Sequence, residues 1–128
     1  MRIGALAASC GCPAETVRYY EKIGLLPQPP RLSNGYRSYD EHHQKWLQFI
    51  LRSRALGFTQ GEVRRLSDIA NQADSACMEV HDLLAEHIVD VQEKLRDLGR
   101  LEKALLRLKS KCREGTLNDC PVIDELMS

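Results

Sequence analysis

The sequence predicts an all-α chain with one small β-hairpin, followed by a long helix that pairs in a coiled coil. Three observations support this prediction: two short helical segments joined by a glycine, an Asn-Gly pair within residues 31–39, and an apolar heptad over 76–110. We expect three regions. These are a compact domain with connecting helices over 1–72, a dimerisation helix over 73–111, and a loop with a short helix over 112–128.

Composition narrows the classes of protein that the chain can belong to. The longest apolar runs are too short for a membrane span, and residues 1–20 lack the order of a secretory signal. We therefore expect a cytoplasmic chain with no membrane partner. The 128 residues include 5 cysteines, and an odd count in a reducing compartment argues against a disulfide framework.

The zero net charge hides an asymmetry between the two halves. Residues 1–70 hold 10 Lys and Arg against 6 Asp and Glu, whereas residues 71–128 hold 8 against 12. The first half is therefore modestly basic, as a nucleic-acid module would be, and the second half is acidic. A surplus of this size is also common on ordinary solvated surfaces.

The chain begins with a helix, a turn and a second helix. Residues 3–7 form a short apolar face, and Gly11 is suited to a sharp turn. The next helix, 13–22, starts at a proline, which fits a first helical position, and places Val17 and Tyr20 on its inner face. This pattern fits a helix-turn-helix, whose second helix enters the major groove, or a simple α-hairpin within a core. The outward residues are Glu15, Thr16, Arg18 and Tyr19.

Residues 31–39 predict a hairpin with a two-residue turn at Asn34-Gly35. A hairpin of this size cannot bury a core, so we expect it to project as a wing beside the helix-turn-helix. Its side chains suit phosphate contacts, which fix the register on DNA without reading sequence. The residues expected to make them are Arg31, Tyr36, Arg37 and Tyr39.

Two further helices are expected before residue 72. Asp40 is the expected N-cap of a helix that ends near Leu56-Gly57, and Thr59 with Glu62 predicts a capping box for the next. The residues expected on the buried side of the second helix are Val63, Leu66, Ile69 and Ala70. The residues expected on a solvated surface early in the first helix are His42 and His43.

The long helix predicts a dimer. One position of its heptad reads Leu84, Val91, Leu98 and Leu105. A stripe sustained over several heptads is typical of a coiled coil, and the simplest partner is a second copy of the chain.

The same heptad position continues into two cysteines, Cys77 and Cys112. They are 35 residues apart, roughly 50 Å along a helix, so one chain cannot bring them together through this helix. Antiparallel pairing places Cys77 of one chain near Cys112 of the other, and a loop over 113–119 could return Cys120 to the same place. Each dimer would then have two symmetric sites.

Three thiolates that converge in a cytoplasmic protein indicate a soft metal ion. Cd²⁺, Pb²⁺ or Hg²⁺ suits a three-sulfur site, and Zn²⁺ becomes feasible if water, His81 or Glu79 supplies a fourth ligand. The alternative is that these thiols only pack as small buried side chains. For Cys10 and Cys12, beside the turn glycine, we expect packing.

Several segments resemble the MerR family of bacterial transcription activators. They are Ile3-Gly4-Ala5-Leu6-Ala7, Thr16-Val17-Arg18-Tyr19-Tyr20-Glu21, Asn34-Gly35-Tyr36-Arg37-Ser38-Tyr39, Arg54-Ala55-Leu56-Gly57-Phe58-Thr59 and Asp119-Cys120-Pro121-Val122-Ile123. The resemblance implies a winged helix-turn-helix homodimer, joined by an antiparallel coiled coil, on double-stranded promoter DNA. Effector binding in this family distorts the DNA and realigns the promoter for RNA polymerase. It further implies that Thr16, Arg18 and Tyr19 contact DNA from the recognition helix.

Within the family, Cys77, Cys112 and Cys120 correspond to the ligands of the branch that senses divalent soft metals. Copper(I) sensors have a non-ligating residue where Cys77 stands. The resemblance therefore implies an activator of metal efflux or detoxification genes that responds to Cd²⁺, Pb²⁺, Hg²⁺ or Zn²⁺.

The alternatives are a copper(I) or organic-effector regulator of the same fold, and a structural DNA-binding coiled-coil protein whose thiols only pack. An enzyme is not expected, because the chain has no Cys-x-x-Cys and no evident pairing of a nucleophile with a base.

Overall fold

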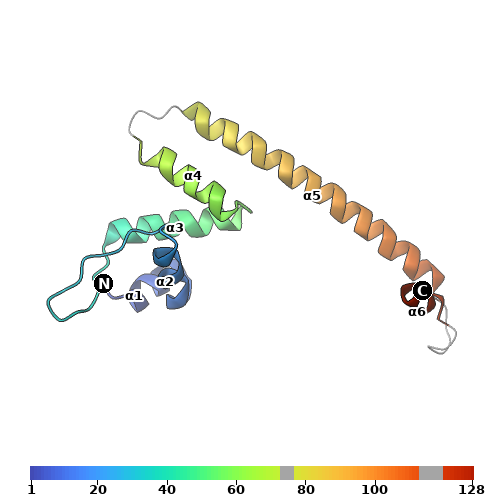
Figure 1. The fold of residues 1–128 in the computed structure, drawn as a ribbon, viewed down its shortest axis with the longest axis horizontal. Coiled ribbons are helices and arrows are strands. Elements are labelled where there is room, and N and C mark those ends of the chain that lie inside the picture. Colours follow the sequence, from blue (N-terminus) through green and yellow to red (C-terminus); the bar gives the residue numbers. More distant parts are fainter. Residues whose placement is uncertain (73–76, 113–119) are drawn as a thin grey trace. The chain divides into compact units, whose positions relative to one another are not determined.

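The computed structural model describes residues 1–72, 77–112 and 120–128. Its helices are α1 (Ile3–Cys10), α2 (Ala14–Lys22), α3 (Glu41–Ala55), α4 (Gln60–Ala70), α5 (Cys77–Lys111) and α6 (Pro121–Met127) (Figure 1). The chain forms two compact units, Met1–His81 and Asp82–Ser128. A mostly helical chain with a helix-turn-helix region and a long C-terminal helix is confirmed. The predicted boundary at 72/73 adjoins residues 73–76, which lie outside the described residues.

A tight turn joins α1 to α2. Gly11 has a φ of 75°, in the left-handed region that glycine adopts with little strain. Pro13 takes the N-cap position of α2, one residue before the predicted first helical position. Leu6 and Val17 are fully buried and Tyr20 is nearly so, so the two helices pack through their predicted inner faces.

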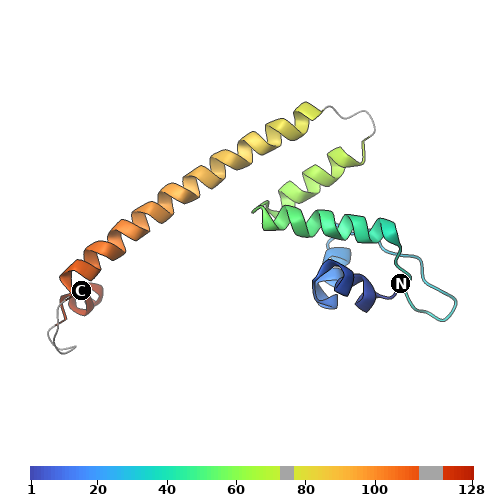
Figure 2. The same cartoon turned by 180° about the vertical axis from the view of Figure 1, so that it is seen from behind.

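The hairpin loop is one residue longer than predicted. The Leu32 N–H donates to the Tyr36 carbonyl at 2.7 Å, so the loop between them spans residues 33–35. A two-residue type I′ turn needs positive φ at both central residues. Gly35 has a φ of 85°, but among the described residues no other residue type has a positive φ, and this includes Asn34. The two-residue prediction is therefore wrong. The hairpin projects away from α1, α2 and α3 in both views (Figures 1 and 2).

Capping boxes begin both α3 and α4, whereas the sequence predicted only an N-cap at Asp40 and a capping box at Thr59 with Glu62. The His43 N–H donates to Asp40 Oδ1 at 3.2 Å, and the Glu62 N–H donates to Thr59 Oγ1 at 3.2 Å. In both boxes the side chain of the third helical residue accepts a hydrogen bond from the N-cap backbone N–H. Gly57, with a φ of 86°, follows the last turn of α3.

The solvated position expected for His43 is wrong. This side chain turns back to close the capping box with Asp40, and its ring packs edge-on against Tyr39, with the centroids 5.4 Å apart. Only 5% of the residue is exposed as a result. His42, one position earlier, is exposed as expected.

The core of the unit Met1–His81 combines residues from four helices and the segments between them. It contains Leu6, Ala7, Val17, Tyr20, Leu25, Leu26, Tyr39, Leu47, Ile50, Phe58 and Val63. On α4, Val63 is buried as predicted, Leu66 and Ile69 are half-buried, and Ala70 is exposed at the last position of the helix. The predicted buried side of α4 is thus correct at its centre and wrong at its end.

The long helix α5 runs for 35 residues without a break. The predicted start at residue 76 lies outside the described residues. The apolar heptad residues Leu84, Val91, Leu98 and Leu105 are all exposed on this helix. Contacts among the described residues therefore leave these four side chains exposed, whereas Leu83 and His87 on the same helix are buried. No helix in the described part of the chain has the length and apolar character needed to cross a membrane.

Candidate functional site

The outer face of α2 carries the residues predicted to contact DNA. Arg18 and Tyr19 are exposed, and Thr16 is half-buried. The side-chain amide of Gln60, in α4, donates to the Tyr19 hydroxyl at 2.7 Å and so restrains that ring. Because Val17 and Tyr20 pack α2 against the core, Arg18 and Tyr19 face outward.

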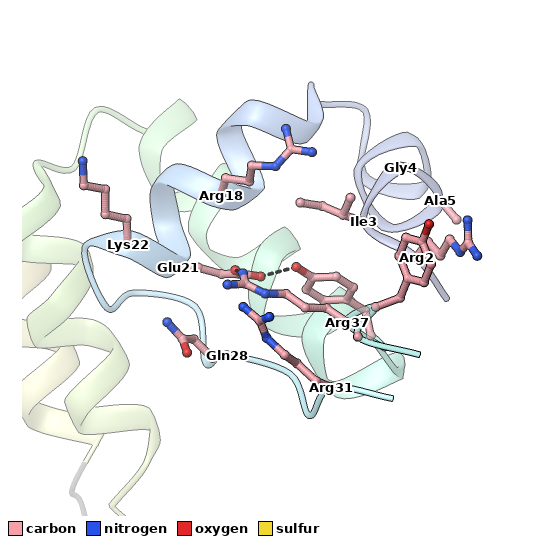
Figure 3. A pocket seen from close by; sticks show the side chains of 13 residues that line it. Arg2, Ile3, Gly4, Ala5, Arg18, Glu21, Lys22, Gln28, Arg31 and Arg37 are labelled. Carbon is pink, nitrogen blue, oxygen red and sulfur yellow. Dashed lines mark hydrogen bonds and ion pairs between the residues drawn. The ribbon is translucent and has the colours of Figure 1, made fainter. Parts of the chain in front are cut away.

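A cavity of about 930 Å³ lies between α1, α2 and the hairpin (Figure 3). Its lining comprises Arg2, Ile3, Gly4, Ala5, Arg18, Glu21, Lys22, Gln28, Arg31, Gly35, Tyr36, Arg37 and Tyr39. Arginine and lysine supply five of these side chains, and Glu21 is the one acidic member. A concave surface with this excess of positive charge attracts anions, and a phosphate backbone is the anion suited to an extended basic surface.

The hairpin presents two of its four predicted phosphate-contact residues openly. Arg31 is exposed, and Tyr36 is 53% exposed. The Arg2 guanidinium lies 4.2 Å from the centroid of the Tyr36 ring, a cation–π contact that connects α1's N-cap to the hairpin. This contact brings a further cation to the cavity.

The other two predicted contacts, Arg37 and Tyr39, are engaged inside the protein. Glu21 accepts an ion-pair hydrogen bond from Arg37 Nη1 and a hydrogen bond from the Tyr39 hydroxyl (Figure 3). Burial, followed by the hydrogen bond to Glu21, raises the pKa of Tyr39 to about 12. Tyr39 is 2% exposed, so a phosphate contact from its hydroxyl would require this arrangement to open. The phosphate contacts of both residues stay predictions.

Glu21, Arg2 and Lys22 were not among the predicted site residues. Glu21 had a signal in the sequence, because it lies four residues after Val17 and therefore on the same inner face of α2. A carboxylate on an inner helix face requires donors. The sequence alone does not say that these donors come from the hairpin.

The three predicted metal ligands lie at helix ends. Cys77 is the first residue of α5 and Cys112 directly follows its last residue, and both are exposed. Cys120 is half-buried at the N-cap of α6. The candidate extra ligands Glu79 and His81 are exposed near the start of α5. The predicted metal-binding loop, 113–119, lies outside the described residues.

Within the unit Asp82–Ser128, α6 is held at the end of α5. Lys111 Nζ lies 2.9 Å from Glu125 Oε2, an ion pair between the last residue of α5 and the second half of α6. Figure 1 shows α6 at the C-terminal end of α5. Cys112 directly follows α5 and Cys120 directly precedes α6, so both cysteines adjoin this end of the long helix. Cys77, at the opposite end of α5, does not join them within one chain.

The other two cysteines differ from these three in setting. Cys10 and Cys12 are half-buried at the turn between α1 and α2. Burial and the neighbouring Cys10 raise the pKa of the Cys12 thiol. A raised pKa disfavours the thiolate that a metal needs, which is consistent with the packing role expected for Cys12.

Two family models together match residues 1–108. The model described as MerR HTH family regulatory protein matches residues 1–68, and the model described as MerR, DNA binding matches residues 44–108. A mercuric resistance operon regulatory protein from Bacillus cereus is 41% identical over 127 residues, covering 98% of this chain and 96% of the relative.

Two solved structures are similar over nearly full length. One is the transcription regulator PbrR691 from Ralstonia metallidurans CH34 in complex with lead(II), with 39% identity, a TM-score of 0.87 and 98% of both chains covered. The other is the dual-function transcriptional regulator MerR from Bacillus megaterium MB1 in complex with mercury(II), with 37% identity, a TM-score of 0.77 and 100% of both chains covered.

Proposed function

The chain belongs to the MerR family of helix-turn-helix regulatory proteins, and from that premise we propose that it is a transcriptional regulator responsive to a divalent heavy-metal ion. The sequence did not predict an enzyme, and membership of a family of transcriptional regulators agrees with that prediction. The observation that carries the metal proposal is the position of three cysteines at the two ends of α5. The lead(II) and mercury(II) complexes of the two similar regulators support it.

The proposed site uses two protomers. Cys112 and Cys120, at one end of α5, would bind the ion together with Cys77 of the partner subunit, which antiparallel pairing brings to that end. The donor set fits the ion, because all three cysteines are free thiols and thiolates are soft ligands for Cd²⁺, Pb²⁺, Hg²⁺ and Zn²⁺. Glu79 or His81 of the partner subunit, within the first turns of α5, is a further candidate ligand for Zn²⁺.

The DNA-binding part of the proposal uses the cationic cavity. The exposed residues of α2 would enter the major groove, and the projecting hairpin would contact phosphates beside it. We further propose that metal binding makes the cytoplasmic dimer distort promoter DNA and thereby activates efflux or detoxification genes through RNA polymerase. A solved EcmrR–DNA complex in EcmrR-RPo, which is 28% identical over 87% of this chain and 40% of that chain, supports the DNA-binding part of this proposal.

A competition titration tests the metal proposal. The reduced protein is titrated with Zn²⁺, Cd²⁺, Pb²⁺ and Hg²⁺, while thiolate-to-metal ultraviolet absorption and stoichiometry are followed. One tightly bound ion per chain, lost in Cys77→Ser and retained in Cys10→Ser, supports the shared three-thiolate site. Tight binding of a monovalent ion that survives Cys77→Ser contradicts it and favours a copper(I) regulator. Absence of binding favours thiols that only pack.

A further inference from the structure

We propose that Glu21, Arg37 and Tyr39 form a clasp that positions the hairpin against the DNA-reading helix, so that Arg37 and Tyr39 act on DNA binding without contacting a phosphate. This inference rests on the proposed DNA-binding function and assigns a role to residues within the same site. It replaces two of the phosphate contacts expected from the sequence with positioning residues.

The three residues join segments that are distant along the chain. Glu21 lies in the last turn of α2, while Arg37 and Tyr39 lie on the returning arm of the hairpin, 16 and 18 residues later. The Glu21 side chain is 2% exposed and the Arg37 side chain 34% exposed, so the hydrogen bond from Tyr39 is buried and the one from Arg37 is partly buried. Buried carboxylates require such partners, because an unpaired charge away from water is costly.

The clasp is also anchored on its far side. The Tyr39 ring packs edge-on against His43, and His43 closes the capping box that starts α3. The returning arm of the hairpin is therefore fixed between α2 and α3. Hairpins with few backbone bridges are marginal by themselves, and here the described bridge is the pair Arg31 and Arg37. Backbone contacts also hold this arm, because the Tyr39 N–H donates to the Met1 carbonyl at 2.7 Å and the N-terminal ammonium donates to the Tyr39 carbonyl at 2.6 Å. The side-chain contacts of Glu21 add to these in setting the direction in which the hairpin projects.

Arg37 differs from Arg18, Lys22 and Arg31 in that its charge is paired with a carboxylate. Glu21 neutralises Arg37 locally, whereas no ion pair within the described residues engages Arg18, Lys22 or Arg31. These three side chains are exposed, and they line the same cavity (Figure 3). A phosphate that enters the cavity would meet their charges, while the guanidinium of Arg37 already has an anion.

The salt dependence of DNA affinity distinguishes the two roles of an arginine. A side chain that neutralises a phosphate contributes about 0.9 to the slope of log affinity against log salt concentration. A positioning residue changes the affinity and leaves that slope in place. The probe is a duplex that the wild-type full-length protein enriches from a random library, with binding followed by fluorescence anisotropy over a salt series.

The expected results separate Arg37 from Arg31. Arg37→Ala and Tyr39→Phe should each weaken binding about tenfold, the scale of one lost buried hydrogen bond, without a change in slope. Arg31→Ala, the matched control from the opposite arm, should lower the slope by about 0.9. Glu21→Gln combined with Arg37→Gln should weaken binding no more than either change alone, because the two residues act as one unit.

Several outcomes overturn the clasp. If Arg37→Ala lowers the slope by about 0.9, Arg37 contacts a phosphate and the assignment is wrong. Thermal unfolding shows whether Arg37→Ala still folds. If it does not, Tyr39→Phe and Arg37→Lys are measured instead. Unchanged DNA affinity in both of these variants rejects the clasp. If the wild-type protein enriches no duplex at all, the proposed DNA-binding function itself fails, and the clasp fails with it.

Discussion

The units Met1–His81 and Asp82–Ser128 differ in how far each buries its own apolar side chains. The first buries an apolar core, and it gives the buried carboxylate of Glu21 two donors. In the second, Leu98 and Leu105 of α5 are 60% and 64% exposed. Apolar stripes of this length mark interfaces in soluble proteins. The first unit therefore has a core of its own within one chain. The second unit needs another surface to cover its apolar stripe.

The largest expected effect is on metal binding, and it tests whether the surface that covers the stripe belongs to a second copy of the chain. If the metal site is shared between protomers, Cys77→Ser and Cys112→Ser homodimers should each bind no ion tightly. A mixed dimer of the two variants retains one intact site, because the unchanged Cys77 of one protomer meets Cys112 and Cys120 of the other. Stoichiometry by thiolate absorption on purified mixed dimers should give one ion per dimer. A mixed dimer that binds none contradicts the shared site.

The next effect concerns the apolar stripe itself. Leu98→Glu places a carboxylate at the proposed dimer seam, where antiparallel pairing buries it without a partner. We expect the dimer dissociation constant, measured by sedimentation, to rise by on the order of a hundredfold. The core of the first unit should keep its thermal unfolding transition. Gln92→Glu, exposed on α5 away from the stripe, is the matched control. Equal dimerisation of the two variants would show that Leu98 lies outside the interface.

A smaller effect should come from the charges along α5. Residues 77–93 hold five acidic side chains and no Lys or Arg, whereas residues 94–111 hold seven basic and two acidic side chains. The midpoint between Cys77 and Cys112 falls beside Lys94, where the sign changes. Antiparallel pairing in the proposed register therefore places each acidic half along a basic half, and parallel pairing places like charges together.

Charge reversal tests this orientation. The substitutions are Arg96→Glu, Arg100→Glu, Lys103→Glu and Arg107→Glu in one chain. Self-association at low salt should weaken about tenfold, and the loss should shrink at 1 M salt, where the Debye length is about 3 Å. A second variant with Asp82, Glu86, Asp90 and Glu93 changed to Lys should restore association when the two are mixed. Unchanged self-association at every salt concentration would exclude charge as a determinant of orientation.

The difference between the units also explains what could be predicted from the sequence. Local signals were sufficient for the N-cap at Asp40, the capping box at Thr59 and the turn at Gly11, because each depends on residues a few positions apart. The engagement of Tyr39 by Glu21 depends on a contact between segments 18 residues apart, which periodicity does not reveal. The burial of His43 was missed although its contacts with Asp40 and Tyr39 are local, because periodicity does not show that a side chain turns back to cap its own helix. The hairpin loop was missed because Asn-Gly fits both a two-residue and a three-residue loop.

The smallest expected effect is on the pH dependence of the first unit's stability. It tests whether contacts within one chain hold Tyr39 in its neutral form. Tyr39 has a pKa of about 12 in the fold, and an unfolded tyrosine ionises near pH 10. Folding thus favours the neutral phenol. Its contribution is fully present below about pH 10 and is lost as the pH rises toward about 12.

Tyr39→Phe lacks this group and should be less stable by roughly 1 kcal/mol at neutral pH. In urea unfolding, its deficit relative to the wild type should narrow above about pH 10. A deficit that stays constant with pH would mean that the phenol ionises as readily in the fold as in the unfolded chain, and that Glu21 does not hold its proton.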